Sequence, residues 1–285
     1  MKTLGVIANC AKERAPVVLA RLRRKAEVLG LSLLPDTATA GLMEMNSDFT
    51  PYDVVQQADI VMVLGGDGSM LRVVRELEGR DIPVIGVNLG ALGFMTSVTE
   101  NDLERALECL VEGNYSTSHR VMLDCMVVRN GGDVVGTYRA LNDVVIISGA
   151  RVGTLRMSVD SQEVGDFVCD GLIVSTPTGS TGHSLSAGGP VLMPTSPAVV
   201  VSLICPHTLS TRPLVIPNDS KVEVKIVERV VGGKLSVDGQ VGQPLEIGDL
   251  VRVTRSHNGV RFIHLPGYNY FSVLRQKLHW RGSNV

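Results

Sequence analysis

The stretch Ile60-Val61-Met62-Val63-Leu64-Gly65-Gly66-Asp67-Gly68-Ser69 decides the fold of this 285-residue chain. It opens with consecutive apolar residues, which is typical of a parallel strand that is buried on both faces of a sheet. A glycine-rich turn with one aspartate follows, and a helical pattern runs from about residue 69 to 78. A buried strand that passes through glycines into a helix is the building unit of an open, doubly wound α/β sheet.

The segments on both sides of this stretch repeat the alternation of strand and helix. The expected strands are 4–8, 31–34 and 84–87, and the expected helices are 15–29 and 101–111. Asn101 stands where a helix cap is expected, because its side chain can accept a hydrogen bond from the first turn. We therefore predict an N-terminal open parallel α/β domain over residues 1–112.

After about Gly113 the pattern changes to short β-branched runs separated by Gly, Asn, Asp or Pro, which is typical of antiparallel sheets. The expected strands are 121–128, 134–140, 144–147, 155–159, 172–174, 199–203, 222–227 and 250–253. This predicts a β-rich, sandwich-like second domain over residues 113–267. Helical spacing returns at residues 270–280, and we expect the segment 268–285 to pack back onto the α/β domain.

Composition narrows the function classes. The net charge of -2 and the pI near 6.3 argue against a general binder of nucleic acid or of membrane surfaces. The 5 cysteines are far apart and show no metal-ligand spacing, so we expect free thiols in a reducing cytoplasm. The apolar runs are too short to span a bilayer. The apolar run at the N-terminus has the pattern of a strand, and we expect no export signal there.

The glycine–aspartate loop has the form of an anion site. Glycines let backbone N–H groups approach a phosphate closely, and the start of the following helix favours negative charge. Asp67 could then serve as a general base or hold a cation; the alternative is that Asp67 only caps the helix. Arg72 lies near the first turn, where it could reach a phosphate or could simply be a solvated charge. The loop matches neither the Rossmann pattern nor the Walker pattern.

A second segment is notable for its lack of charge. No Asp, Glu, Lys or Arg occurs in residues 171–211, although 20% of the chain is charged. Its many hydroxyls and glycines suit neutral rings and sugars, and we favour a binding loop. The alternative is a buried loop whose hydroxyls satisfy its own backbone. His183 fits a ring that lines a pocket better than a proton-transfer group, because no nucleophile elbow surrounds it.

Several segments, in order along most of the chain, resemble the motifs of the NAD kinase family, also called ATP-NAD or polyphosphate/ATP-NAD kinases. They are residues 65–69 (GGDGS), 88–95 (NLGALGFM), 141–143 (LND), 170–190, 205–214, 237–240 (VDGQ) and 271–280. The GGDG loop alone also occurs in phosphofructokinases and in lipid kinases. The long hydroxyl-rich segment is specific to the NAD kinases.

The resemblance implies an enzyme that binds NAD between an α/β domain and a β-rich domain. It implies phosphoryl transfer to the 2′-hydroxyl of the adenosine ribose, which makes NADP, with ATP, another nucleoside triphosphate or polyphosphate as the donor. Mg²⁺ or another divalent cation, and a homodimer or homotetramer, are implied as well. The apolar stretch 190–203 suits an interface between subunits, although residues 199–203 also suit a core strand within one chain.

Carried onto this sequence, the family motifs imply that Asp67 is the catalytic base. Phe94 would line the adenine region, and Asn142 and Asp143 would bind ribose hydroxyls. The full set of expected substrate-binding residues is Gly68, Arg72, Phe94, Asn142, Asp143, Asp170, Thr181, Gly182, His183, Ser184, Leu185, Ser186 and Gln240.

The sequence departs from the family pattern at two places. Asp143 stands where Glu is usual, so its carboxylate reaches about one methylene less far. Gly182-His183 replaces the commoner Ala-Tyr, which makes the ring at position 183 smaller and titratable near neutral pH. These departures bear on affinity and on the choice between NAD and NADH. Two alternatives are a lipid or sugar kinase that shares only the GGDG loop, and a non-catalytic NAD(P) sensor.

Overall fold

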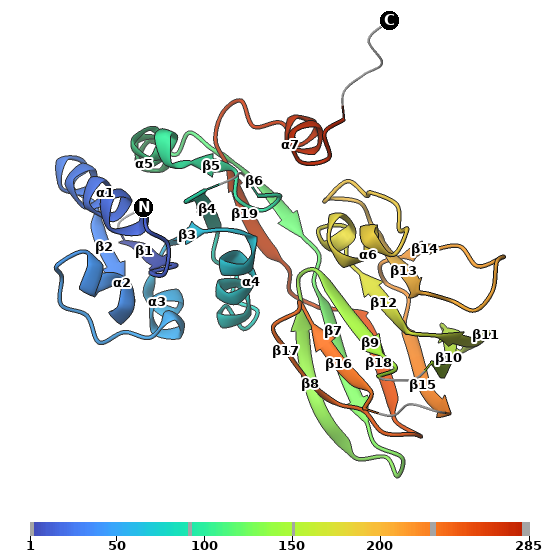
Figure 1. The fold of residues 1–285 in the computed structure, drawn as a ribbon. Coiled ribbons are helices and arrows are strands. Elements are labelled where there is room, and N and C mark those ends of the chain that lie inside the picture. The colour runs from blue at the N-terminus through green and yellow to red at the C-terminus, as the bar shows by residue number, and fades with distance from the viewer. Residues whose placement is uncertain (1–2, 91–92, 150–151, 229–231, 281–285) are drawn as a thin grey trace, which may run out of the picture. The chain divides into compact units, whose positions relative to one another are not determined.

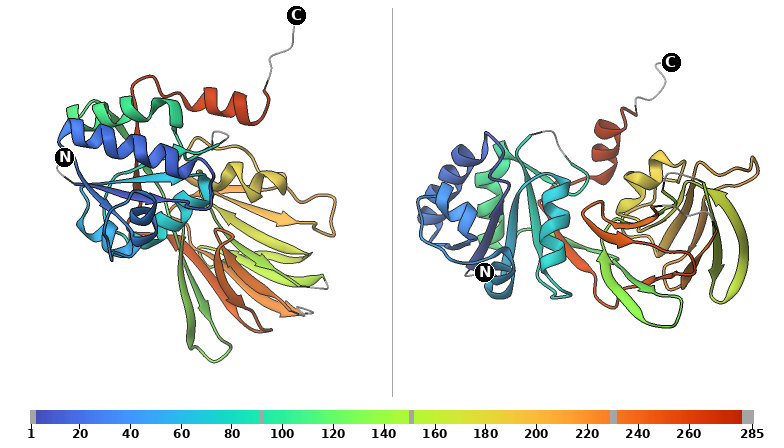
Figure 2. Two further views of the ribbon diagram at one scale, coloured as in Figure 1. Left: turned by 60° about the vertical axis from the view of Figure 1, so that its left-hand side comes forward. Right: turned by 60° about the horizontal axis from the view of Figure 1, so that its bottom comes forward.

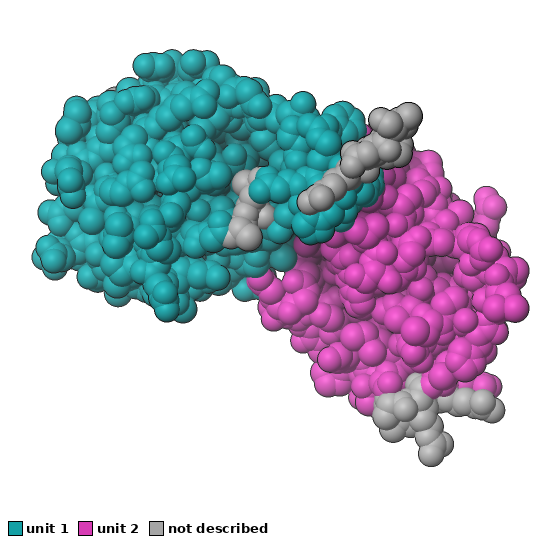
Figure 3. Space-filling model, turned by 45° about the horizontal axis from the view of Figure 1, so that its top comes forward, with its two compact units in different colours: residues 1–119, 260–285 teal, residues 120–259 magenta. Residues whose placement is uncertain are grey.

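The computed structural model describes residues 3–90, 93–149, 152–228 and 232–280 (Figure 1). The chain divides into two compact units: unit 1 holds residues 1–119 and 260–285, and unit 2 holds residues 120–259 (Figure 3). The boundaries expected from the sequence were 112/113 and 267/268. The difference arises because the strands β6 (Ser116–Arg120) and β19 (Val260–His264) join the sheet of unit 1.

Unit 1 is built around one sheet with the strand order β2-β1-β3-β4-β19-β6, to which β5 adds beside β4. The remaining elements of this unit are β1 (Thr3–Ala8), α1 (Ala15–Leu29), β2 (Ser32–Pro35), α2 (Thr37–Leu42), α3 (Pro51–Gln57), β3 (Ile60–Gly65), α4 (Asp67–Glu76), β4 (Val84–Asn88), β5 (Val98–Thr99), η1 (Glu100–Asp102), α5 (Leu103–Glu112) and α7 (Tyr270–Lys277). The pairs β1–β2, β1–β3, β3–β4, β4–β5 and β4–β19 are all parallel.

Alternate side chains of these strands enter two different layers. Leu4, Met62 and Ile85 share one core with apolar residues of α1 and α5, which lie side by side over that face (Figure 2). On the opposite face, a Cβ added to Gly5 would be 2.8 Å from the Cβ of Ala58 and from Cγ1 of Val54, beside α3. The sheet is therefore covered on both faces, and the predicted doubly wound arrangement is confirmed.

The helix after β4 begins later than the sequence suggested. Asn101 lies inside the short turn η1, and Asp102 occupies the cap position of α5 without making a side-chain capping bond. The carboxylate of Asp102 instead accepts a hydrogen bond from the Thr99 hydroxyl at 2.7 Å. The expectation that Asn101 caps this helix was wrong, because the tight turn before α5 displaces the cap by a residue.

Unit 2 contains two antiparallel sheets, with the orders β11-β10-β15-β18-β7-β8 and β14-β13-β12-β9-β16-β17. Its elements are β7 (Leu123–Val128), β8 (Val134–Ala140), β9 (Asp143–Ile147), β10 (Gly153–Val159), β11 (Gln162–Cys169), β12 (Gly171–Ser175), η2 (Gly179–Thr181), α6 (His183–Ser186), β13 (Ala198–Ile204), β14 (Leu214–Pro217), β15 (Val222–Glu228), β16 (Lys234–Val237), β17 (Val241–Pro244) and β18 (Leu250–Arg255).

The two sheets pack face to face around one apolar core. Val144, Leu172 and Val201 of the second sheet share this core with Leu155 and Val251 of the first. This confirms the predicted β-rich, sandwich-like architecture. The other face of the second sheet carries α6, where the Ser184 hydroxyl hydrogen-bonds that of Ser202 on β13 at 3.1 Å.

The uncharged stretch 190–203 separates into two environments. Val199, Val200 and Val201 on β13 are almost fully buried inside unit 2. Residues 199–203 therefore form an intrachain strand, which was the alternative to a subunit interface for this part. The loop before β13 is more open, since Met193 is 41% exposed. Among the described residues, no helix has both the length and the apolar character needed to cross a membrane.

Candidate functional site

The glycine–aspartate loop of unit 1 joins β3 to α4. Gly66 precedes the helix with an extended backbone and provides no side-chain cap, and Asp67 is the first helical residue. A Cβ added to Gly65 would lie 2.3 Å from the hydroxyl oxygen of Ser69, so a side chain at position 65 would collide with the first turn. Added Cβ atoms at Gly66 and Gly68 would meet nothing within 4 Å.

The carboxylate of Asp67 reaches across to a segment nearly thirty residues further along the chain. Its Oδ2 accepts a hydrogen bond from the backbone N–H of Phe94 at 2.9 Å. Its Oδ1 accepts one from the N–H of Met95 at 3.0 Å. Asp67 therefore does not cap α4, and that alternative reading of the sequence is wrong. Each oxygen keeps a second lone pair, so the half-buried carboxylate can still accept a proton.

The segment that Asp67 holds is packed tightly against it. A Cβ added to Gly93 would lie 2.0 Å from Oδ1 of Asp67 and 2.7 Å from the Thr96 hydroxyl oxygen. That hydroxyl accepts hydrogen bonds from the N–H of Gly93 at 3.0 Å and from the Asn88 amide at 2.9 Å. Glycine at position 93 thus allows the backbone to approach the carboxylate. Ala91 and Leu92 of the same motif lie outside the described residues.

Phe94 also contacts the end of the chain. The Lys277 ammonium nitrogen of α7 lies 5.9 Å from the centre of the Phe94 ring, within the range of a cation–π contact. The terminal helix α7 thus belongs to the same compact unit as Phe94. Arg72 is exposed on α4, and its expected contact with phosphate stays a prediction.

Several hydroxyls of the hydroxyl-rich segment of unit 2 are already bonded to backbone groups of the protein. The Thr176 hydroxyl donates to the Leu141 carbonyl at 2.6 Å and accepts from the Gly179 N–H at 3.1 Å. The Ser180 hydroxyl donates to the Pro177 carbonyl at 2.7 Å. For Ser180 the simpler alternative holds, because its hydroxyl satisfies the backbone of its own loop, whereas the Thr176 hydroxyl ties the loop to Leu141. Ser184 is likewise fully buried.

A pocket of about 250 Å³ lies on the outer face of the second sheet of unit 2. Its lining residues are Asn142, Asp143, Val145, Ile147, His183, Ser236, Asp238 and Gly239. Three of these, Asn142, Asp143 and His183, are among the residues expected from the sequence. Val145 and Ile147 supply an apolar wall along β9, while polar groups gather where β9 begins. The pocket therefore combines apolar surface with a few convergent polar groups, as small-molecule sites do.

The other expected residues of unit 2 do not line this pocket. Gln240 lines a neighbouring groove of about 580 Å³ along β16 and β17. Asp170 is exposed just before β12, whose first residue pairs with Ile147, at the opposite end of β9 from Asp143. The Thr181 hydroxyl bonds the Thr178 carbonyl at 3.4 Å. Gly182 and Ser186 are exposed beside His183, and Leu185 is half-buried. Their contacts with substrate stay predictions.

Sequence reasoning did not single out Asp238, which lines the pocket. Its residue pair Asp238-Gly239 belongs to a recognised motif, but Gln240 was chosen from that motif as the functional residue. In the structure Asp238 lies beside Asp143 in the pocket lining. Burial raises the pKa of the Asp143 carboxyl to about 7, and the negative charge of Asp238 adds to this rise. An Asp-Gly turn between two short strands was the available signal.

The described residues contain no cluster of three or more His, Cys, Asp or Glu side chains placed to hold a metal ion. A divalent cation that accompanies a nucleoside triphosphate is commonly held by phosphate oxygens, water and one or two carboxylates. The side chains present fit that mode of binding and do not fit a cage made by the protein alone.

Comparisons with known proteins agree on one family. The N-terminal domain of the ATP-NAD kinases matches residues 6–115, and the C-terminal domain of the ATP-NAD kinases matches residues 141–265. A protein named NAD kinase from Syntrophotalea carbinolica is 39% identical to this chain, covering 98% of this chain and 99% of the relative. A protein of the same name from Geobacter sulfurreducens is also 39% identical, with the same coverage.

Two solved structures share the fold. A yeast NADH kinase complexed with NADH superposes with a TM-score of 0.90 at 24% identity, covering 100% of this chain and 89% of that chain. An NAD kinase from Archaeoglobus fulgidus in complex with ATP superposes with a TM-score of 0.77 at 24% identity, covering 98% of this chain and 100% of that chain.

Proposed function

Because this chain belongs to the NAD kinase family, we propose that it transfers the terminal phosphoryl group of ATP to the 2′-hydroxyl of the adenosine ribose of NAD. The resemblance drawn from the sequence motifs is confirmed over nearly the whole chain. The observation that carries the proposal is the carboxylate of Asp67 at the start of α4, which the backbone N–H groups of Phe94 and Met95 hold in place.

Phosphoryl transfer depends mainly on positioning and on neutralising charge. In the proposed reaction the 2′-oxygen forms a bond to the γ-phosphorus, and the bond from that phosphorus to the β,γ-bridging oxygen breaks. The proton of the 2′-hydroxyl passes to Asp67, and ADP leaves. The backbone at Gly66 and Gly68, which is open on the side where a Cβ would stand, leaves room for phosphate oxygens beside the helix start.

Unit 2 is proposed to recognise the nucleotide. Oδ1 of Asn142 is buried and lacks a hydrogen-bond donor within the described part of the chain. An unpaired acceptor in a pocket is a suitable partner for a ribose hydroxyl, because its desolvation is then compensated. The His183 ring lines the same pocket and can pack against a base or an amide-bearing ring.

We propose that Mg²⁺ or another divalent cation accompanies the triphosphate, and we place the enzyme in the cytoplasm. All five cysteines are free thiols, as expected for a reducing compartment. Cell fractionation followed by immunoblotting tests the location. Removal of the cation with EDTA should abolish turnover, and added Mg²⁺ should restore it.

We also propose a homodimer or homotetramer. One edge strand of each sandwich sheet exposes apolar side chains, with Val164 and Val168 on β11 and Val215 on β14 each at least 45% exposed. Exposed apolar strand edges favour association with another chain. Light scattering at low micromolar concentration decides between the states, because a fully active species near 30.5 kDa would exclude the oligomer.

The central test measures NADP formation with NAD or NADH crossed against ATP and polyphosphate, each with and without Mg²⁺. We expect NADP from NAD and ATP in the presence of the cation. Tight NAD binding without turnover under any donor would instead favour a non-catalytic sensor.

A further inference from the structure

The turn between β16 and β17 is fastened to a distant strand by one side chain. Oδ1 of Asp238 accepts hydrogen bonds from the backbone N–H groups of Asn142 at 2.7 Å and Asp143 at 3.1 Å. Its Oδ2 accepts the N–H of Leu141 at 2.9 Å. One carboxylate therefore holds three successive N–H groups at the point where β9 begins.

The backbone of the turn adds to this attachment. The N–H of Asp238 donates to the carbonyl of Asp143 at 3.0 Å. Asp238 has a φ of 53°, in the left-handed region, where a short polar residue such as Asp is tolerated better than a branched one. The turn is thus held in an unusual conformation that points an acidic side chain at the 141–143 segment.

The segment held in this way carries the polar groups of the pocket. The unpaired Oδ1 belongs to Asn142, and the Asp143 carboxyl is only 6% exposed and lines the same cavity. The direction of both side chains follows from the backbone that Asp238 fixes.

We propose that Asp238 is a positioning residue for nucleotide binding, which aligns Asn142 and Asp143 toward the hydroxyl groups of the ligand through three backbone hydrogen bonds. The inference rests on the proposed function, since it assumes that NAD occupies this pocket. It assigns a role to a residue that makes no chemical step of its own.

The charge on Asp238 has a second effect on the same site. Three titratable groups line the pocket: Asp143 on β9, Asp238 on the turn and His183 on α6. Burial disfavours the charged form of the Asp143 carboxyl, and the nearby Asp238 carboxyl adds to this effect. The pKa of Asp143 near 7 means that this group changes from an O–H donor to an acceptor as the pH rises through neutrality. Removing the charge of Asp238 should lower the pKa of Asp143, while the larger effect of burial remains.

The test compares Asp238→Asn and Asp238→Ala with the wild-type full chain. The dissociation constant for NAD is measured by calorimetry from pH 5.5 to 8.5, beside the KM values for NAD and ATP. We expect a roughly tenfold weaker NAD affinity for Asp238→Asn and a larger loss for Asp238→Ala, because charge-assisted hydrogen bonds are lost. The KM for ATP should stay unchanged, and the midpoint of the pH dependence should move to lower pH in Asp238→Asn.

Asp160→Asn is the matched control. Asp160 also has a left-handed φ, 50°, in a hairpin turn of unit 2, and its carboxylate accepts the backbone N–H of Lys221 at 2.8 Å. It is absent from the pocket lining, so NAD affinity and its pH midpoint should match the wild type. Asp143→Asn, which cannot titrate, should lose the pH dependence attributed to position 143.

Unchanged NAD affinity and pH midpoint in Asp238→Asn, or equal losses in Asp160→Asn, would overturn the inference. Should Asp238→Asn fail to fold, a wild-type pH dependence in Asp143→Asn would overturn it as well. A wild-type protein that neither binds NAD nor forms NADP would instead refute the proposed function, so the two failures remain distinguishable.

Discussion

Unit 1 and unit 2 each contain an aspartate that holds a distant backbone segment, and we propose different chemical roles for the two aspartates. In each unit an aspartate beside a glycine accepts backbone N–H groups from a segment distant in sequence: Asp67 from 94–95, and Asp238 from 141–143. Asp67 accepts two such bonds. Asp238 accepts three and lies beside a second carboxyl, Asp143.

The number of hydrogen bonds indicates which carboxylate can still accept a proton from the substrate. A carboxylate that accepts one bond at each oxygen still has lone pairs for a substrate proton, as Asp67 does. Asp238, which accepts three such bonds, holds the 141–143 segment in place. Burial, with a smaller contribution from the charge of Asp238, raises the pKa of the neighbouring Asp143 to about 7. This difference fits the proposal that Asp67 transfers the proton and that the pocket lined by Asp238 recognises the ligand.

The strongest challenge to this comparison is Asp67→Asn. The amide keeps the size of the side chain and loses its basicity, so we expect kcat to fall by roughly 100-fold or more. NAD affinity, which we assign to unit 2, should be retained. The matched control is Asp53→Asn in α3, because that carboxylate also accepts a backbone N–H, from Thr50 at 2.8 Å. Near-normal turnover in Asp67→Asn would remove Asp67 as the base.

A smaller loss is expected from Gly93→Ala. Its Cβ would meet Oδ1 of Asp67 at 2.0 Å, so the carboxylate must move. A displaced catalytic group of this kind should lower kcat by about 10- to 100-fold without changing NAD affinity. Gly90→Ala is the control, because its Cβ would meet only the Asn88 amide oxygen at 3.8 Å. Equal kinetics for the two variants would show that the position of Asp67 does not limit turnover.

The Gly68→Ala variant separates an effect on the stability of the fold from an effect on the KM for ATP. An alanine fits the helix and meets no atom within 4 Å, so it should stabilise the protein by about 0.5 kcal/mol in thermal or urea unfolding. If phosphate oxygens approach this backbone, the KM for ATP should rise roughly tenfold. Gly41→Ala in α2 should give the same stabilisation with unchanged KM, since its Cβ also meets nothing. An unchanged KM in Gly68→Ala would place the phosphates elsewhere.

The His183→Tyr variant tests whether the pocket of unit 2 serves only to bind the ligand. The larger ring offers more stacking area, so NAD affinity should stay equal or improve by about threefold, with little change in kcat. Isothermal calorimetry and steady-state kinetics report the two quantities. Loss of turnover at intact NAD affinity would indicate a chemical role for the imidazole, contrary to the division of labour between the units.

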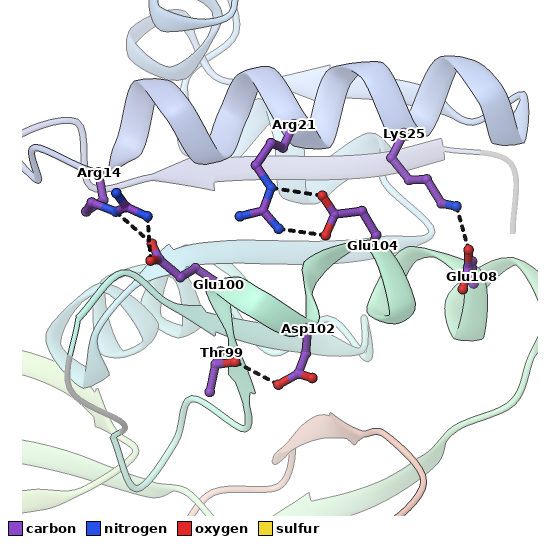
Figure 4. Close-up of polar contacts among 8 residues, drawn as sticks. All are labelled: Arg14, Arg21, Lys25, Thr99, Glu100, Asp102, Glu104 and Glu108. Carbon is purple, nitrogen blue, oxygen red and sulfur yellow. Dashed lines mark hydrogen bonds and ion pairs between the residues drawn. The ribbon is translucent and has the colours of Figure 1, made fainter.

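The smallest effect concerns a part of unit 1 that lies apart from the site. Three ion pairs join residues 14–25, in and just before α1, to residues 100–108 of η1 and α5 (Figure 4). They are Arg14–Glu100, Arg21–Glu104 and Lys25–Glu108. A double-mutant cycle on Arg21 and Glu104, which form two hydrogen bonds at 2.9 and 2.7 Å, should give a coupling of about 0.2–1 kcal/mol.

The same pair has a defined pH dependence. The hydrogen bond from Arg21 lowers the pKa of the Glu104 carboxyl below its ordinary value. The stabilising contribution is therefore present above the unfolded pKa and is lost as the pH falls through the lower, folded pKa. NADP formation should be unaffected by either substitution, and a change in kcat would show that this pair supports the site.

Local sequence signals predicted the parts of the fold that depend on local chemistry. The expected helix 15–29 is the observed α1, because proline near its start and Gly30 with a φ of 66° at its end define both boundaries. The strand 134–140 is the observed β8 for the same reason, since turn residues bound it. Short α2 was missed because a single helical turn and a half carries no clear apolar period.

Contacts between distant segments were beyond the reach of such signals. Nothing in the composition of the 260–264 segment shows that it inserts beside β4, since that depends on parallel pairing with residue 84. The role of Asp238 depends on N–H groups 95 to 97 residues away. Composition likewise could not show that the Ser180 hydroxyl bonds within its own loop, while the Thr176 hydroxyl donates to the carbonyl of Leu141.

The place of β19 in the first sheet sets an order of events during synthesis. β19 lies between β4 and β6, yet it leaves the ribosome after all of unit 2. The continuous stretch 120–259 can therefore fold while β4 and β6 still lack the strand that separates them. The nascent α/β unit must keep two strand edges open until residue 264 emerges, so the domain that begins first is completed last.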